Sequence, residues 1–213
     1  MKNLKWCIYT YRHRRAFEYC VRKYIHEPAL REEMLRRAAV HDMDKMIMYL
    51  SMDQKEAQEM HVKTQPHHLE NDLTRTYEDY VETVIDYECA PYTKPDKPLN
   101  AYDFTQLLMD RKALDEETGN ALISIMEDIG IANSTTYIDD EEGQRYISSL
   151  GEVTEEMINK EILTYINEHP DIELSNILDY AHKSCSSEKM KSKLLIKERF
   201  SYKVKNALFC RLV

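Results

Sequence analysis

The sequence predicts an all-α protein, and three observations support this. The 213 residues include only four Gly and six Pro, which is few turn residues for a fold built from short strands. Leu, Met, Ala, Glu, Lys and Arg make up most of the rest, and these residues favour helices. Apolar residues also recur at three- and four-residue steps in several segments, the spacing of one helix face. We therefore expect a helical bundle, long enough to bury a core.

The first expected helix spans about residues 2–26. Its apolar stripe includes a histidine, His13, which lies opposite an Arg-rich face. The stripe consists of Trp6, Tyr9, His13, Phe17, Cys20 and Tyr24. The helix ends here because Pro28 disfavours helical geometry at Glu27.

A second helix is expected over about 29–52, with polar groups on its inward face. Its stripe consists of Met34, Ala38, His41, Asp42, Lys45 and Tyr49. A third, short helix covers about 54–63 and stops before Pro66. A fourth begins near His67 or Leu73 and continues through Tyr87.

The remaining chain divides at segments rich in turn residues. Residues 90–100 hold three Pro in eight residues, which indicates an irregular stretch. Further helices are expected at about 101–113, 115–130, 154–168, 172–184 and 187–208, and a loop or short hairpin within 132–153. We therefore expect a helical domain over 1–131, a linker or irregular segment over 132–153, and a C-terminal helical extension over 154–213.

Composition excludes several classes of protein. No stretch approaches the roughly 20 apolar residues of a membrane-spanning helix, and the charged opening MKNLKWCIYTYRHRR is unlike a signal peptide. Five scattered Cys without a CxxC pair are typical of reduced thiols, so we expect a cytoplasmic protein. The net charge of −9 disfavours tight non-specific binding to nucleic acid. A homo-oligomer remains open.

Histidines and carboxylates in the first half of the chain suggest a metal site. Six of the eight His precede position 69. Imidazole and carboxylate groups are the usual ligands of Zn, Fe, Mn and similar ions. Several of these residues fall on inward helix faces, where burial without a partner or a metal is costly. The candidate set consists of His13, His41, Asp42, Lys45, His61, His67, His68 and Asp86.

The order of these residues resembles that of a known family. The pattern His…His-Asp…His…His…Asp is similar to the HD superfamily of metal-dependent phosphohydrolases. The segment HDMDK (41–45) looks like the HDxxK form of its dinuclear members, which include cyclic-dinucleotide phosphodiesterases and symmetrical dinucleoside-tetraphosphate hydrolases. The resemblance implies an HD-domain-like helical bundle with additional C-terminal helices.

A second resemblance covers about residues 1–130. The segments YRHRRAFEYC, HDMDK, HVKTQPHH and VIDYECA look like those of an uncharacterised family of bacterial and phage proteins. This resemblance implies no activity, but it does suggest the cytoplasm of a bacterial cell or of a phage-infected host.

The HD resemblance implies a set of metal ligands. The ligands that match the first metal of the superfamily are His13, His41, Asp42 and Asp86. Asp42 would also bridge to a second metal, held by His61 and by His67 or His68. His61 and His67 are six residues apart, where many dinuclear members place about a helix and a loop, so one or two ions are expected. Their identity stays open among Fe, Mn, Zn, Mg and Ni or Co.

Two further assignments concern catalysis and the last ligand. Lys45 matches the lysine that contacts the substrate phosphate in the superfamily, so Lys45 and Asp42 are the expected catalytic residues. Asp79 lies two turns before Asp86 on the same helix face, and it is the alternative last ligand.

The expected reaction is hydrolysis of a phosphate ester in a nucleotide or cyclic nucleotide. Three arginines flank His13 and are candidates to bind further phosphates: Arg12, Arg14 and Arg15. Five tyrosines near the inward faces could stack on a base, although core packing is the alternative for most of them: Tyr11, Tyr49, Tyr77, Tyr80 and Tyr87. No Gly-rich phosphate loop, GxSxG or HExxH is present, which argues against kinases, serine hydrolases and zincins.

Two other functions use the same residues. An HD-type di-iron oxygenase would need the same ligands but would consume dioxygen. A catalytically inactive nucleotide-binding or inhibitor protein of a phage or bacterium would keep the fold without turnover.

Overall fold

The computed structural model describes residues 3–50, 52–94, 99–131 and 140–168. These residues form helices and connecting segments, with no strand among them, so the all-α prediction is confirmed. Two of the predicted helices, 172–184 and 187–208, lie outside the described residues.

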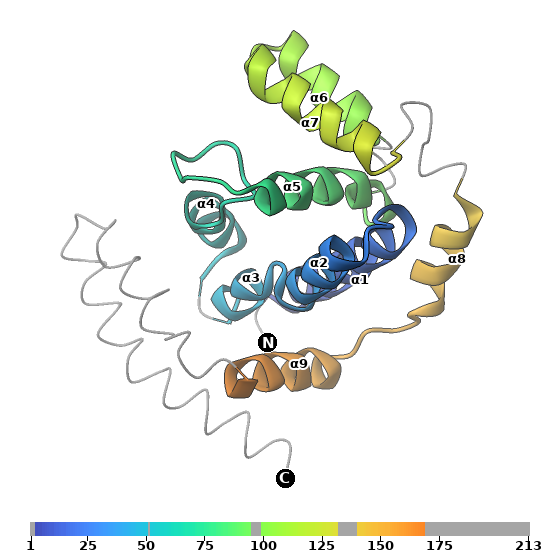
Figure 1. The fold of residues 1–213 in the computed structure, drawn as a ribbon. Coiled ribbons are helices and arrows are strands. Elements are labelled where there is room, and N and C mark those ends of the chain that lie inside the picture. The colour runs from blue at the N-terminus through green and yellow to red at the C-terminus, as the bar shows by residue number, and fades with distance from the viewer. Residues whose placement is uncertain (1–2, 51, 95–98, 132–139, 169–213) are drawn as a thin grey trace, which may run out of the picture.

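The helices are arranged around α1 (Leu4–Tyr24), as Figure 1 shows. This helix packs against α2 (Pro28–Val40), α3 (Met43–Met48) and α5 (Tyr77–Cys89). The short helix α4 (Gln54–Thr64) contacts α3, and the 3-10 turn η1 (Ala90–Tyr92) follows α5. The helices α6 (Ala101–Asp110) and α7 (Glu116–Asp128) form a hairpin that packs on α5.

Side-chain caps explain where several helices begin. Thr76 and Asp79 form a capping box at the start of α5, an arrangement in which two backbone N–H groups gain acceptors. Asp53, Asn100 and Asp115 each accept a hydrogen bond from the backbone N–H three residues on, at the starts of α4, α6 and α7. These capping residues are visible in the sequence, and the predicted starts of these three helices agree to within about a residue.

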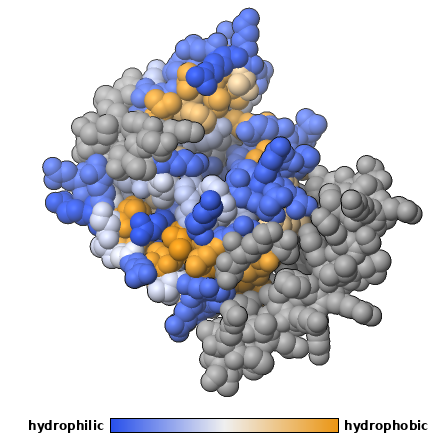
Figure 2. Space-filling view, turned by 180° about the vertical axis from the view of Figure 1, so that it is seen from behind, coloured by the Kyte–Doolittle hydropathy of each residue, from blue (hydrophilic) through white to orange (hydrophobic). Residues whose placement is uncertain are grey.

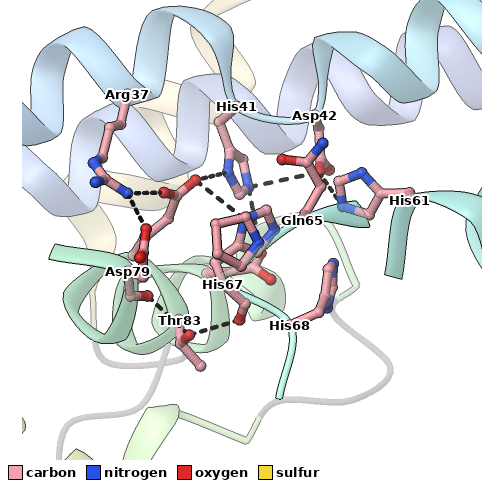
Figure 3. A network of polar contacts seen from close by, with 12 residues as sticks. Arg37, His41, Asp42, His61, Gln65, His67, His68, Asp79 and Thr83 are labelled. Atoms are coloured by element: carbon pink, nitrogen blue, oxygen red, sulfur yellow. Dashed lines mark hydrogen bonds and ion pairs between the residues drawn. The ribbon is translucent and has the colours of Figure 1, made fainter. Parts of the chain in front are cut away.

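The predicted single helix over 29–52 is broken at the His-Asp doublet. Helix α2 ends at Val40, and Asp42 adopts left-handed geometry with φ of 60° before α3 begins at Met43. Asp tolerates this conformation better than most residues. The break turns the side chains of His41 and Asp42 toward α4 and α5 (Figure 3). Local helix propensity alone could not predict it.

The predicted helix start at His67 or Leu73 is also wrong. Residues 65–76 form an ordered loop instead, and α5 begins at Tyr77. The guanidinium group of Arg75 donates to the backbone carbonyls of Pro66, His68, Asn71 and Leu73. Side-chain hydrogen bonds thus replace the helical ladder, and they hold the backbone that carries His67 and His68.

The segment predicted to be irregular contains a helix, α8 (Glu141–Ser149), which is followed by α9 (Glu155–Glu168). Both helices pack against α1. Helix α8 lies so close to α1 and η1 that a Cβ at Gly143 would clash with the rings of Tyr19 and Tyr92. The proposed domain boundaries at 131 and 153 stay a prediction.

Two apolar clusters form the core. One surrounds Phe17 and Val84 between α1, α2, α5 and the α6–α7 hairpin, and the other surrounds Met46 and Ile158 between α1, α3 and α9. The His41–Asp42 doublet connects α2, which contributes to the first cluster, with α3, which contributes to the second. Figure 2 shows a largely hydrophilic face with hydrophobic side chains gathered in patches. None of the described helices combines the length and apolar character needed to cross a membrane.

Candidate metal centre

The predicted ligands come from five separate segments and converge. His13 lies on α1, His41 and Asp42 lie between α2 and α3, His61 lies on α4, and Asp86 lies on α5. The loop before α5 adds a further pair, His67 and His68. Figure 3 shows the side chains of His41, Asp42, His61 and His67 directed toward one another.

One half of the centre combines His13, His41, Asp42 and Asp86. The Nε2 atom of His13 lies 2.7 Å from Oδ1 of Asp86, and Nε2 of His41 lies 3.6 Å from the same oxygen. Nε2 of His41 is also 3.9 Å from Oδ1 of Asp42. Potential ligand atoms of His13, His41 and Asp42 all lie within 4.8 Å of one another. One ion can therefore be reached by several of these groups.

The other half combines His61, His67 and His68. Their ring centroids are 4.5 to 5.3 Å apart, and one ring nitrogen from each falls within a common 4.8 Å. Nε2 of His61 lies 3.0 Å from Oδ1 of Asp42, so Asp42 lies between the two halves. The loop geometry of 65–76 lets His67 reach this position although it is only six residues from His61.

Two carboxylates that the sequence analysis missed orient the histidines. Oε1 of Glu82 accepts a hydrogen bond from Nδ1 of His41 at 3.0 Å and lies 3.3 Å from Nδ1 of His67. Oδ2 of Asp44 accepts from Nδ1 of His61 at 2.8 Å. Because a carboxylate only accepts, these Nδ1 atoms carry a proton, which leaves Nε2 as the ring nitrogen that can bind a metal in the neutral imidazole.

Both missed residues had a signal in the sequence. Glu82 precedes Asp86 by four residues and therefore shares its helix face. Asp44 lies within HDMDK itself. What the sequence could not show is which imidazole each carboxylate would face.

The unsatisfied atoms of the centre fit a bound cation. Buried polar atoms normally have hydrogen-bond partners. Here the Nε2 atoms of four histidines and both carboxylate oxygens of Asp42 are buried without a partner in hydrogen-bond geometry; the histidines are His41, His61, His67 and His68. Oriented lone pairs of this kind, together with carboxylates, are the donor set of a transition-metal site.

The pKa shifts indicate that the centre attracts positive charge. Burial opposes protonation of His41, but Asp42 and the hydrogen bonds to Asp86 and Glu82 outweigh it and raise the pKa of His41 to about 10. Burial and the charge of His41 lower the pKa of His67 to about 4, and burial lowers that of His68 to about 3. The carboxylates thus favour a cation, while His67 and His68 stay in the neutral form that binds metals.

The structure distinguishes Asp86 from Asp79. Asp79 accepts hydrogen bonds from Thr76 in the capping box and from Arg37 at 2.7 Å. Asp86 instead contacts His13 and His41. Asp79 therefore caps α5 and pairs with Arg37, whereas Asp86 is the carboxylate that lies beside the histidines of the candidate centre.

The three arginines beside His13 have other partners. Arg14 and Arg15 both form ion pairs with Glu161 of α9, and Arg12 donates to the carbonyl of Gly151 at 2.8 Å. These contacts tie α1 to the C-terminal part of the described chain. We therefore do not assign the three arginines to substrate binding.

The centre opens into a cleft of about 940 Å³. His13, Lys45, His68 and Asp86 form part of its wall, so both halves of the centre can be reached from it. Five aromatic residues also line it: Trp6, Tyr9, Tyr49, Tyr87 and Phe104. Of the five tyrosines considered as base-stacking residues, Tyr49 and Tyr87 lie here. The other three, Tyr11, Tyr77 and Tyr80, are not among the lining residues.

Comparisons with known proteins add no assignment. No protein-family model, no curated protein and no solved structure matches the chain.

Proposed function

We propose that the chain is a metal-dependent phosphohydrolase or phosphodiesterase that acts on a nucleotide or cyclic nucleotide. The observation that carries the proposal is the convergence of unpartnered histidine nitrogens and the Asp42 carboxylate next to a cleft that His13, Lys45, His68 and Asp86 line. When bound, one or two divalent ions would acidify a water molecule and neutralise charge on phosphoryl oxygens.

The ligands divide into two sets that share Asp42. His13, His41, Asp42 and Asp86 would hold one ion, and His61, His67, His68 and Asp42 would hold a second. A site with both imidazole and carboxylate donors binds Fe, Mn, Zn, Ni and Co better than a site with oxygen donors alone. Glu82 and Asp44 keep the rings in the orientation that binding requires.

Lys45 supports the proposal as a fixed positive charge. Its Nζ lies 2.7 Å from Oδ2 of Asp42, and the side chain lines the cleft. Burial would lower the pKa of Lys45, but Asp42 and Asp86 outweigh burial and raise it above its usual value. Lys45 therefore stays protonated, and it can orient and stabilise a phosphate oxygen but cannot serve as a base.

The aromatic walls supply the nucleotide part of the proposal. The ring of Tyr87 contacts that of Phe104 edge to face, with centroids 4.8 Å apart. The ring of Tyr9 stacks on that of His13 at 5.8 Å. Aromatic surfaces of this kind can bind a base by stacking.

The decisive variant is Asp42→Asn. Asn also tolerates the left-handed backbone at this position, so the substitution removes charge while sparing the turn. We expect metal content, measured by elemental analysis, to fall from one or two ions per chain to a small fraction of one. Hydrolysis of a panel of mono-, di- and cyclic nucleotides should fall with it. The matched control is Asp115→Asn at the start of α7, which should change neither quantity.

Three results would contradict the proposal. Asp42→Asn could retain its metal and its wild-type rate. The wild-type protein, loaded with Mn²⁺ or Fe²⁺, could bind nucleotides and release them intact, as an inhibitor or nucleotide-binding protein would. Turnover could consume dioxygen, as in a di-iron oxygenase.

A further inference from the structure

The charge of the cleft differs from that of the whole chain. The chain has a net charge of −9, yet the described residues lining the cleft include three cationic side chains, Lys45, Lys94 and Arg111, and one carboxylate, Asp86. Asp86 already contacts two histidines. Lys45 is also paired with Asp42, so the cationic groups of the cleft wall that remain for an anionic ligand are Lys94 and Arg111.

The cations occupy two different depths. Lys45 is buried beside Asp42 at the metal centre. Lys94 and Arg111 are exposed, and no ion pair involving either is found among the described residues. A positive charge that neutralises no carboxylate of its own is free to bind an anion from solution.

Tyr9 contacts both Lys94 and a predicted metal ligand, His13. The ammonium group of Lys94 lies 5.3 Å from the centroid of the Tyr9 ring. That ring in turn stacks on His13, with centroids 5.8 Å apart and an angle of 11° between the planes. Lys94 therefore lies beside Tyr9 at an exposed part of the cleft wall, whereas Lys45 is buried. Arg111, at the end of α6, lines the same cleft.

We propose that this cleft has a second anion subsite, formed by Lys94 and Arg111, and that its substrate carries a second phosphate group there. The reacting phosphate would occupy the buried end beside Lys45, and the aromatic walls would contact the part of the substrate that joins the two phosphates. The inference rests on the proposed function for the identity of the reacting group. The subsite itself depends only on the two cations and their place in the cleft.

The test uses pairs of probes that differ by one phosphate. Adenosine 5′-monophosphate is compared with adenosine 3′,5′-bisphosphate, and the dinucleoside monophosphate ApA with its 5′-phosphorylated form pApA. Dissociation constants are measured by calorimetry on the metal-free protein, where no turnover occurs. Steady-state kinetics are measured on the Mn²⁺-loaded protein. The variants are Lys94→Ala, Arg111→Ala and the double substitution, and the control is Lys63→Ala, an exposed lysine of α4 outside the cleft.

We expect the extra phosphate to improve binding about tenfold in the wild-type protein, since it gains charge-assisted hydrogen bonds. Each single variant should reduce that advantage, and the double variant should abolish it. Binding of the singly phosphorylated probes should change less than about twofold. In the kinetics the same variants should raise KM for the doubly phosphorylated probe and leave kcat for the singly phosphorylated probe unchanged. Lys63→Ala should behave as wild type.

The outcomes separate the two proposals. If the advantage of the second phosphate persists in the double variant, the subsite is wrong even where hydrolysis is observed. If no probe is hydrolysed but the advantage depends on Lys94 and Arg111, the subsite stands and the hydrolase assignment fails.

Discussion

Two regions of the molecule bury carboxylates against α1, and they differ in how the polar atoms are satisfied. Asp140, at the start of α8, accepts hydrogen bonds from the hydroxyls of Tyr19 and Tyr92, the ammonium of Lys23 and the backbone of Gly143. Asp42, at the candidate centre, has two oxygens without a partner in hydrogen-bond geometry. We call the first region the Asp140 cluster.

The difference separates a structural role from a binding role. A buried ionised group is stabilising only when its remaining lone pairs are satisfied. The Asp140 cluster meets that condition within the protein, so it fastens α8 to α1 and η1. At the candidate centre Lys45 pairs with the charge of Asp42, but the Nε2 atoms of four histidines have no hydrogen-bond partner, and a bound cation would satisfy them. Burial and charge alone do not distinguish the two regions, whereas the count of satisfied atoms does.

The largest effect on stability is expected from Asp140→Ala. It removes the acceptor of Lys23 and of two tyrosine hydroxyls, and it leaves a partly buried ammonium without its carboxylate. We expect the free energy of unfolding to fall by about 3 kcal/mol, measured by chemical denaturation. Metal content should stay at the wild-type value in the folded protein. A loss of metal at full stability would show that the Asp140 cluster is coupled to the centre.

A smaller effect is expected from Glu82→Gln, which perturbs the carboxylate behind His41 and His67. A carboxylate that accepts a hydrogen bond from a metal-binding histidine typically raises metal affinity 10- to 100-fold, which is about 1.4 to 2.8 kcal/mol. We expect the dissociation constant for Mn²⁺ or Zn²⁺ to rise within that range. The matched control is Glu33→Gln, because Glu33 also pairs with Arg37 but contacts no histidine. Equal effects of the two variants would show that Glu82 acts only through Arg37.

The smallest effect that we expect is a loss of folding stability at low pH. Burial opposes ionisation of Asp140, but the hydrogen bonds from Lys23, Tyr92 and Gly143 outweigh it and lower the pKa to about 2. A carboxyl whose pKa is lower in the folded than in the unfolded state stabilises the fold above the unfolded pKa of about 3.9. That stabilisation, on the order of 2 kcal/mol, is lost as the pH falls from about 4 to about 2.

Asp140→Asn tests this contribution, since Asn retains the cap on α8 but cannot ionise. The difference in unfolding free energy between the wild-type protein and the variant should shrink over that interval, as followed by urea denaturation at several pH values. A difference that stays constant between pH 5 and pH 2 would show that the ionised carboxylate contributes nothing to stability.

The sequence by itself determined the helical class and the approximate positions of helices α1, α4, α6, α7 and α9. Helix periodicity and capping residues such as Asp53 and Asn100 are local signals, and they act over a few residues. It also supplied the candidate ligands, because buried ionisable residues on inward faces are rare without a function. Their use as metal ligands stays a proposal.

Only the tertiary structure decided how those side chains meet. Helix propensity runs unbroken through His41 and Asp42, yet the chain turns there, where Asp42 contacts Lys45 and His61. The choice of Asp86 over Asp79 and the pairing of Glu82 with His41 likewise depend on how α5 packs against α1 and α2. Contacts between residues some forty or more positions apart carry no periodic signal in the sequence, since they arise from the packing of whole helices.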